Sequence, residues 1–256
     1  MPSKEFDKNV LSALTPKEKK KKINPQHKGK SWESDAAAIL TKISGLHFQR
    51  IFSSGASVGQ SNRHRIEELT IGQTEQMLGD IAAPETMKQH LIFECKNYAD
   101  LDIHNLISTE QGSKTFYGWL GEMMYDVESA LTTLKSSRTP IGFLCVKLTR
   151  KGSWITVNIG AFRQAFGTTA VFNPPYVMLE HEPRPGLVEA KWSQRWVMID
   201  FERFIKDNAD FMFQQMNDTE IAAMVKATVE RNVAAIQKRS LKDELKGKVS
   251  YLESKL

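Results

Sequence analysis

One short segment, from His90 to Asn97, constrains the fold more than any other part of the chain. It reads His-Leu-Ile-Phe-Glu-Cys-Lys-Asn, an apolar run with the length and composition of a buried β-strand. Because side chains alternate across a strand, Glu94 and Lys96 point to one side and Cys95 to the other. Charged side chains are seldom buried without partners, so we expect a counter-charge or a cation beside this strand.

A second feature lies just upstream of that strand. The pair Gly79-Asp80 precedes Glu94 by 14 residues, inside a segment, 77–83, that is expected to form a short strand. Converging carboxylates bind Mg²⁺ well, because this hard ion prefers oxygen ligands and keeps several waters. A metal there would stabilise phosphate charge and activate a water, and Lys96 would orient that water or stabilise the developing charge. The spacing alone leaves a structural alternative open, in which Glu94 pairs with Lys96 at a sheet edge and Asp80 lies in a turn.

The pattern Glu-x-Lys by itself carries little information. It occurs five times in this chain, beginning at Glu18, Glu94, Glu189, Glu244 and Glu253. Only the pattern at Glu94 lies on an apolar strand that follows a Gly-Asp pair. The context of the pattern therefore makes Glu94 and Lys96 candidates for an active site.

Two helices and one further strand are predicted around the motif in the first half of the chain. A helix is expected from an N-cap at Ser31 to about Gly45, since apolar residues recur there at helical spacing: Trp32, Ala36, Ile39, Leu40 and Ile43. Glu33 lies at the edge of that apolar face, where it would look inward from the rim of the core. Residues 47–53 are expected to form a short strand. Residues 115–135 carry the strongest apolar stripe and are expected to form a core-packed helix.

The second half predicts fewer regular elements. The apolar segments 141–149 and 154–159 are expected to pair as a hairpin, 160–194 to be irregular, and 196–201 to be a strand. From Asp218 onward the chain is predicted to be helical and charged. This order of elements favours the α/β class, with a mixed sheet flanked by helices and a C-terminal helical extension.

Taken in order, Glu33, Gly79-Asp80 and Glu94-Cys95-Lys96 resemble the pattern of the PD-(D/E)xK nuclease superfamily. More narrowly, the chain resembles archaeal-type Holliday-junction resolvases and related phage endonucleases. The segments that carry this narrower resemblance are Gly29-Lys30-Ser31-Trp32-Glu33 and Ser53-Ser54-Gly55-Ala56. It covers roughly residues 29–160; the stretch between Ala56 and Gly79 is long for such a resolvase, and residues beyond about 160 have no counterpart.

The resemblance implies a restriction-endonuclease-like fold and a set of roles. Asp80 and Glu94 would be metal ligands, Lys96 the catalytic lysine, and Glu33 a further acidic member of both the catalytic and the metal-binding set. The implied cofactor is Mg²⁺, with Mn²⁺ expected to substitute. No Walker motif and no dinucleotide fingerprint occurs in the sequence, so no nucleotide cofactor is expected.

The charge of the chain is concentrated at its N-terminus. Residues 1–30 hold nine lysines and three acids, a net charge of +6, whereas the whole chain has +5, which leaves −1 for the remainder. Such a lysine-rich segment is predicted to be disordered. Two interpretations stay open, a mobile arm that attracts DNA phosphates and a solubilising leader. The candidate DNA contacts are Lys19, Lys20, Lys21, Lys22, Ser53, Ser54, Arg63 and Arg65; for the last four, an ordinary turn or solvated loop is the alternative.

We therefore divide the chain into a basic arm (1–30), a nuclease domain (31–212) and a helical tail (213–256). No apolar run reaches the roughly 18 residues of a membrane helix, and no secretory signal is visible. Two cysteines exclude a disulfide framework, so a reducing cytoplasm is expected. The resemblance implies the cytoplasm of a bacterium or a phage-infected host. The apolar seam Leu241–Leu256 is predicted either to join two copies as a homodimer or to fold back on the domain.

The motif and the resemblance together predict a Mg²⁺-dependent DNA endonuclease, and the resemblance to resolvases implies a preference for branched DNA. The alternatives are another nuclease of the same fold, acting on duplex ends or like a restriction enzyme, and a non-catalytic DNA-binding protein that retains the fold. The acidic motif argues against the last, because phosphate binding alone does not need carboxylates. The preferred DNA structure, the host and any protein partners are not specified by the sequence.

Overall fold

A computed structural model of the protein describes residues 25–51, 76–99, 101, 114–133, 138–167, 171–180 and 195–253. Its helices are α2 (Pro25–Ser44), α6 (Lys114–Glu128), a π-helical turn (Ser129–Thr133), α7 (Ile159–Phe166), α8 (Phe201–Met212) and α9 (Asp218–Glu253). Its strands are β1 (Gln49–Arg50), β2 (Ile81–Ala82), β3 (His90–Tyr98), β4 (Pro140–Leu148), β5 (Gly152–Asn158), β6 (Tyr176–Glu180) and β7 (Arg195–Asp200). Within these ranges no helix combines the length and the hydropathy that crossing a membrane would require.

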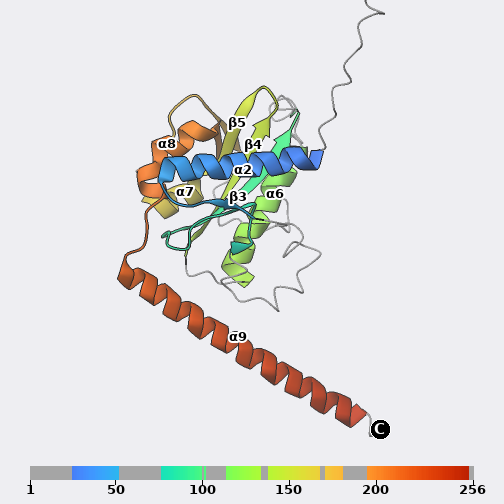
Figure 1. The fold of residues 1–256 in the computed structure, drawn as a ribbon. Coiled ribbons are helices and arrows are strands. Elements are labelled where there is room, and N and C mark those ends of the chain that lie inside the picture. Colours follow the sequence, from blue (N-terminus) through green and yellow to red (C-terminus); the bar gives the residue numbers. More distant parts are fainter. Residues whose placement is uncertain are drawn as a thin grey trace, which may run out of the picture.

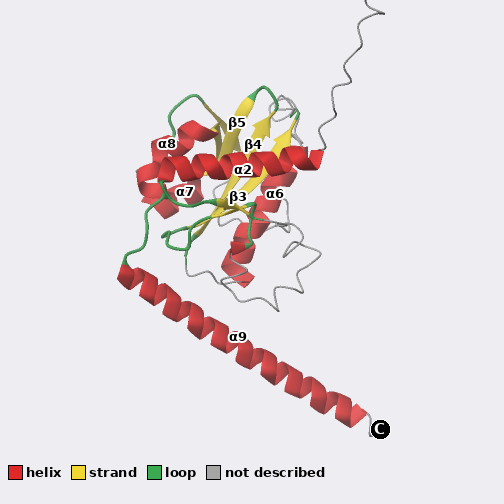
Figure 2. Cartoon of the chain, in the orientation of Figure 1, coloured by secondary structure: helices red, strands yellow, loops and turns green. Residues whose placement is uncertain are grey.

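The strands form one seven-stranded sheet in the order β1-β2-β3-β4-β5-β7-β6. Strands β3 and β4 run parallel, and the other neighbouring pairs are antiparallel. A parallel pair needs a crossover connection, and α6 lies in the connection between β3 and β4. Figure 2 shows this sheet with its helices packed around it. The predicted α/β fold, a restriction-endonuclease-like mixed sheet flanked by helices, is confirmed.

Helices cover both faces of the sheet, and the faces have separate cores. Helices α2, α7 and α8 contribute to the larger core, which includes Phe93 and Phe143, two stacked rings with centroids 5.0 Å apart. Trp32 ties α2 to the sheet by donating from Nε1 to the carbonyl oxygen of Cys145 at 3.0 Å. Helix α6 covers the opposite face, where its apolar residues pack against even-numbered residues of β4 such as Leu144 and Val146.

Helix α9 extends away from the body as a single long helix (Figure 1). Its 36 residues span about 54 Å at 1.5 Å per residue. A reciprocal cap starts it: the Asn217 N–H donates to Glu220 at 2.8 Å, and the Glu220 N–H donates to Asn217 Oδ1 at 2.9 Å. Large apolar side chains along it are exposed, namely Val225, Val229, Val233, Ile236, Leu241, Leu245 and Val249.

Several predicted elements need correction. The helix predicted to start at Ser31 begins at Pro25 instead, so Ser31 lies inside it. Proline is favoured in the first turn of a helix, because a backbone N–H there has no acceptor within the helix and its absence costs no hydrogen bond. The segment predicted to be irregular, 160–194, contains most of α7 and all of β6. Helix α7 is stabilised by Asn158, whose Oδ1 accepts from the Ala161 N–H at 3.0 Å. Helix α8 was not predicted either, although its buried face is mostly apolar and Asp200 caps it.

Candidate active site

Strand β3 places Glu94 and Lys96 on the side of the sheet that α6 covers. Ile92, two residues earlier on the same side, packs with Val127 of α6. The Lys96 Nζ lies 2.6 Å from Glu94 Oε1 and 2.7 Å from Glu122 Oε2. The side chains of Glu94 and Lys96 are only 13% and 20% exposed. The strand thus brings a largely buried carboxylate and ammonium together at the end of an apolar core.

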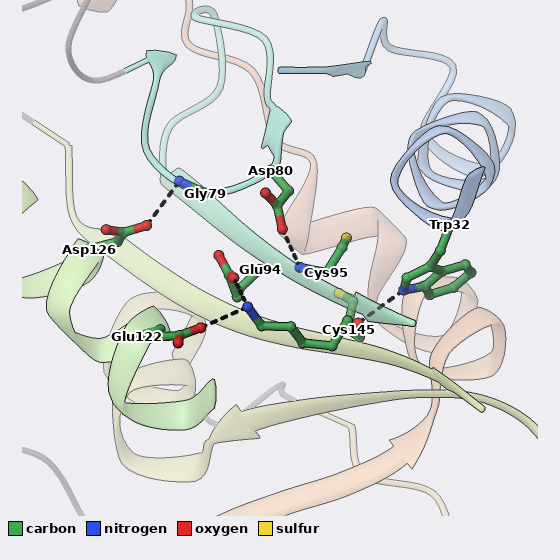
Figure 3. Close-up of polar contacts among 9 residues, drawn as sticks. Trp32, Gly79, Asp80, Glu94, Cys95, Glu122, Asp126 and Cys145 are labelled. Atoms are coloured by element: carbon green, nitrogen blue, oxygen red, sulfur yellow. Dashed lines mark hydrogen bonds and ion pairs between the residues drawn. The ribbon is translucent and has the colours of Figure 1, made fainter. Parts of the chain in front are cut away.

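Asp80 lies beside β3, immediately before β2, in a backbone arrangement that depends on Gly79. The Asp80 N–H donates to the Phe93 carbonyl oxygen at 2.7 Å, and its Oδ2 accepts from the Cys95 N–H at 2.8 Å. Gly79 has φ +74°, and a Cβ there would lie 2.7 Å from the Phe93 carbonyl oxygen. A side chain would therefore force the segment away from β3. The glycine allows the close approach that sets Asp80 opposite Glu94 (Figure 3).

Helix α6 adds two acids that the sequence analysis did not identify, Glu122 and Asp126. They lie one helical turn apart, and Asp126 Oδ2 accepts from the Gly79 N–H at 3.1 Å. Burial raises the pKa of Asp126 to about 6, the Gly79 N–H opposes the rise, and the charge of Asp80 adds to it. On sequence alone, acids at the margin of an amphipathic helix are expected to be solvated. The only available signal was their spacing beside the apolar stripe.

The cluster is short of positive charge. Burial raises the pKa of Glu94 to about 8, the charge of Asp80 adds to the rise, and Lys96 opposes it. Burial lowers the pKa of Lys96, but Glu94 and Glu122 more than offset that effect, so the pKa lies above its usual value. These two shifts compete, because only an ionised Glu94 stabilises the ammonium. Both shifts arise in a largely buried site where carboxylates outnumber the one lysine, so the cluster as a whole favours an additional proton or cation.

Glu33 forms an ion pair with Arg50 of β1. Both side chains are mostly buried, with 16% of Glu33 and 17% of Arg50 exposed. Arg50 pairs across the β1–β2 ladder with Ile81, the residue after Asp80. Glu33 thus lies at the β1 edge of the sheet, with a basic partner that the sequence analysis did not foresee.

The predicted DNA-contacting residues lie outside the described part of the chain. This applies to Lys19, Lys20, Lys21 and Lys22 in the basic segment and to Ser53, Ser54, Arg63 and Arg65 after β1. Their roles stay predictions.

Asp80 and Glu94 offer the oxygen donors that a hard divalent cation prefers. Magnesium commonly uses one or two protein carboxylates, with waters and substrate phosphates completing the octahedron. Among the residues with described positions, no three His, Cys, Asp or Glu side chains gather closely enough to hold a metal by themselves. The donor set therefore fits a cation that water and phosphate help to bind, rather than one enclosed by protein ligands.

A comparison with family models matches part of the chain. Residues 24–131 match the model of a family described as phage putative PDDEXK endonuclease. The matched span runs from the start of α2 through β1, β2 and β3 to the π-helical turn after α6, and it includes Asp80, Glu94 and Lys96. No curated protein and no solved structure matches the chain.

Proposed function

Because the chain belongs to the PD-(D/E)xK nuclease superfamily, we propose that it is a metal-dependent DNA endonuclease with Asp80, Glu94 and Lys96 at its active site. The observation that supports these residues best is their convergence. Two carboxylates from separate segments lie with one lysine in a largely buried cluster whose acids outnumber that lysine. Binding of phosphate alone would not favour such a cluster, so the arrangement argues against a purely DNA-binding role.

The roles follow from the chemistry of each side chain. Asp80 and Glu94 would hold Mg²⁺, or Mn²⁺ in its place, which when bound supplies a water of lowered pKa and neutralises phosphate charge. Lys96 would orient the attacking water and stabilise the negative charge that develops on the phosphate. Glu33 is proposed as an outlying acidic member, held at the β1 edge by Arg50.

A cleavage assay on the full chain tests this function. The protein is incubated with a four-way junction, linear duplex and single-stranded DNA, each with Mg²⁺, with Mn²⁺ and with chelator. We expect cuts that require the divalent ion and that Glu94→Gln abolishes. No cleavage of any substrate by the folded wild-type chain would show that the enzymatic proposal is wrong.

We further propose that the substrate is branched DNA and that the active form is a homodimer. Resolving a four-way junction needs two matched cuts, and a twofold dimer holds two sites in fixed relation. The exposed apolar residues Leu241, Leu245 and Val249 of α9 offer a surface for this contact. Light scattering is expected to give the mass of a dimer, and mapping of end-labelled strands to show paired, symmetric cuts.

A pair of variants tests the dimer contact. Leu245→Glu on the proposed seam should produce a monomer that nicks junctions singly. Val229→Glu is the control, because it is equally exposed yet lies about 160° around the helix at 100° per residue. A wild-type monomer that degrades duplex from its ends would contradict the resolvase proposal and favour an exonuclease of the same fold.

The basic arm is proposed to increase DNA affinity. Deleting residues 1–28 removes most of the net charge of +6 and should weaken DNA binding. Fewer counterions would be released, so the slope of log affinity against log salt should become shallower. An unchanged slope would identify the arm as a leader without a role in binding.

A further inference from the structure

Helix α6 contacts both halves of the proposed catalytic motif through two acids. Asp126 accepts a hydrogen bond from the backbone N–H of Gly79 at 3.1 Å, and Glu122 pairs with Lys96 at 2.7 Å. Figure 3 shows both contacts reaching β3 and the Gly79-Asp80 segment from the same helix. One rigid element therefore touches the segment that carries Asp80 and the lysine that follows Glu94.

The contact of Asp126 supports the position of Asp80. Gly79 has φ +74° and no side chain to anchor it, and glycine populates positive and negative φ about equally, so its own backbone preference does not hold this conformation. The Asp80 N–H and carboxylate are bonded to β3, whereas the Gly79 N–H is bonded to α6. The Gly79-Asp80 segment is thus held by α6 at the glycine and by β3 at the aspartate, which limits the movement of the carboxylate.

The contact of Glu122 supports Lys96. In the structure the ammonium lies between Glu94 and Glu122. A carboxylate that binds a metal has less negative charge to offer a lysine, so Lys96 would lose part of its attachment to Glu94. Glu122 comes from another element, and it would still hold the ammonium toward the site.

We propose that Glu122 and Asp126 are positioning residues of this nuclease site, Glu122 acting through Lys96 and Asp126 through Gly79 and Asp80. The inference rests on the proposed function and adds no metal ligand to it. Asp126 engages Oδ2 with the backbone, and Glu122 engages Oε2 with the ammonium. Both acids therefore shape the site by hydrogen bonding.

Two substitutions at Asp126 separate positioning from metal binding. Asp126→Asn keeps an oxygen acceptor for the Gly79 N–H, so kcat should stay within about threefold of wild type. Asp126→Ala removes the acceptor, and kcat should fall about 10- to 100-fold, the usual cost of losing an orienting partner. The KM for DNA should be unchanged in both. Glu128→Gln is the matched control, since Glu128 lies two residues further on α6 and about 200° around it.

The outcomes are distinct. If Asp126→Asn loses as much activity as Asp80→Asn, Asp126 binds the metal and the proposal is overturned; full activity of Asp126→Ala overturns it as well. Hydrogen exchange of the Gly79 amide gives a readout independent of cleavage: exchange should accelerate in Asp126→Ala and stay slow in Asp126→Asn. An inactive wild type with this exchange pattern would defeat the proposed function alone, whereas unchanged exchange in Asp126→Ala defeats the inference.

Glu122 is tested by charge reversal. Glu122→Gln keeps an acceptor for the ammonium and should retain most of kcat, whereas Glu122→Lys repels Lys96 and should lower kcat about 10- to 100-fold at unchanged KM. The side chain of Glu122 is 56% exposed, so neither variant should disturb folding. Full activity of Glu122→Lys, with Glu128→Lys as its control, would overturn the role of Glu122.

Discussion

The two faces of strand β3 have opposite characters, although their residues alternate along one segment. Toward α2 and α8, the residues Leu91, Phe93 and Cys95 join a continuous apolar core. Toward α6, Ile92 is followed by Glu94 and Lys96, which face further acids. The alternation of side chains along one strand therefore separates residues that stabilise the fold from residues proposed for catalysis. Substitutions on one face should lower stability, and substitutions at the neighbouring positions on the other face should lower the cleavage rate.

The energetic contrast has a physical basis. Burying a large apolar side chain stabilises a fold by about 1.5–3 kcal/mol. Gathering carboxylates in a largely buried space costs stability unless a cation or proton compensates them. The α2 side of β3 should thus hold the domain together, while the α6 side should lower the stability of the metal-free protein in return for binding a cation.

The largest expected effect is the loss of cleavage on the charged face. Asp80→Asn and Glu94→Gln should each lower kcat by at least about 10⁴-fold, or about 5 kcal/mol in the barrier, because the metal loses a ligand. Lys96→Ala should also cleave DNA slowly, but its affinity for the metal should be largely unchanged. Single-turnover cleavage and calorimetry with Mn²⁺ measure the two quantities. Normal turnover of either carboxylate variant would contradict the site assignment.

The apolar face should show the reverse behaviour. Phe93 is fully buried and stacks on Phe143, so Phe93→Ala should lower the free energy of unfolding by about 3–5 kcal/mol. Activity per folded molecule should remain close to wild type at a temperature where the variant is folded. Denaturant unfolding measures the free energy of unfolding, and active-site titration measures the activity per folded molecule. A stable but inactive Phe93→Ala would break the separation between the faces.

The elements that were predicted from sequence are those with a long or regular pattern. The alternation in β3 and the apolar stripe of α6 identified both elements, and the Gly-Asp pair gave the position of Asp80. Glu122 and Asp126 were missed, because their contacts depend on how α6 packs across the sheet. The orientation of a helix on a sheet cannot be inferred from one sequence.

Short elements were missed for a related reason. Strand β6 has five residues and α7 has eight, and both lie in a segment whose prolines suggest irregular structure. Contacts with the rest of the domain stabilise both elements: β6 pairs with β7, and Phe162 of α7 is buried against Phe204 of α8. Tertiary contacts of this kind override local propensity. The Arg50 partner of Glu33 likewise depends on the path of the chain between α2 and β1.

A moderate effect is expected at Gly79, which lies against the backbone of β3. Gly79→Ala should cost about 1–3 kcal/mol of stability and also lower kcat, because a Cβ would collide with the Phe93 backbone and displace Asp80. Gly45→Ala is a matched control, since Gly45 has a similar φ of +70° but nothing within 4 Å of its Cβ position. Unfolding and cleavage assays on both variants separate backbone strain from collision. Equal loss of activity in both would show that proximity to β3 is irrelevant.

The last effect is gradual and concerns pH and the charged face alone. The pKa of Glu94 is raised from 4.5 to about 8 in the folded protein, mainly by burial. A carboxyl group whose pKa is higher in the folded protein binds its proton more tightly in that state. Protonation of Glu94 therefore contributes fully to the free energy of unfolding below about pH 4.5, and this contribution is lost as the pH rises to about 8. The metal-free protein should therefore lose stability across this window, by about 1 kcal/mol per pH unit or less. Asp126 acts in the same direction up to about pH 6.

Glu94→Gln and divalent metal test the cause of this slope. Glutamine cannot ionise, so the slope above pH 6 should largely vanish in Glu94→Gln, and the variant should be more stable than wild type at pH 8. Saturating Mg²⁺ should also restore stability at pH 8 in wild type but not in the variant, because the cation takes the place of the proton. Denaturant unfolding at pH 5, 6, 7 and 8 measures both. A wild-type protein whose stability stays level over this range would show that the carboxylates on the α6 side are already compensated, and the contrast between the two faces of β3 would then lie in catalysis alone.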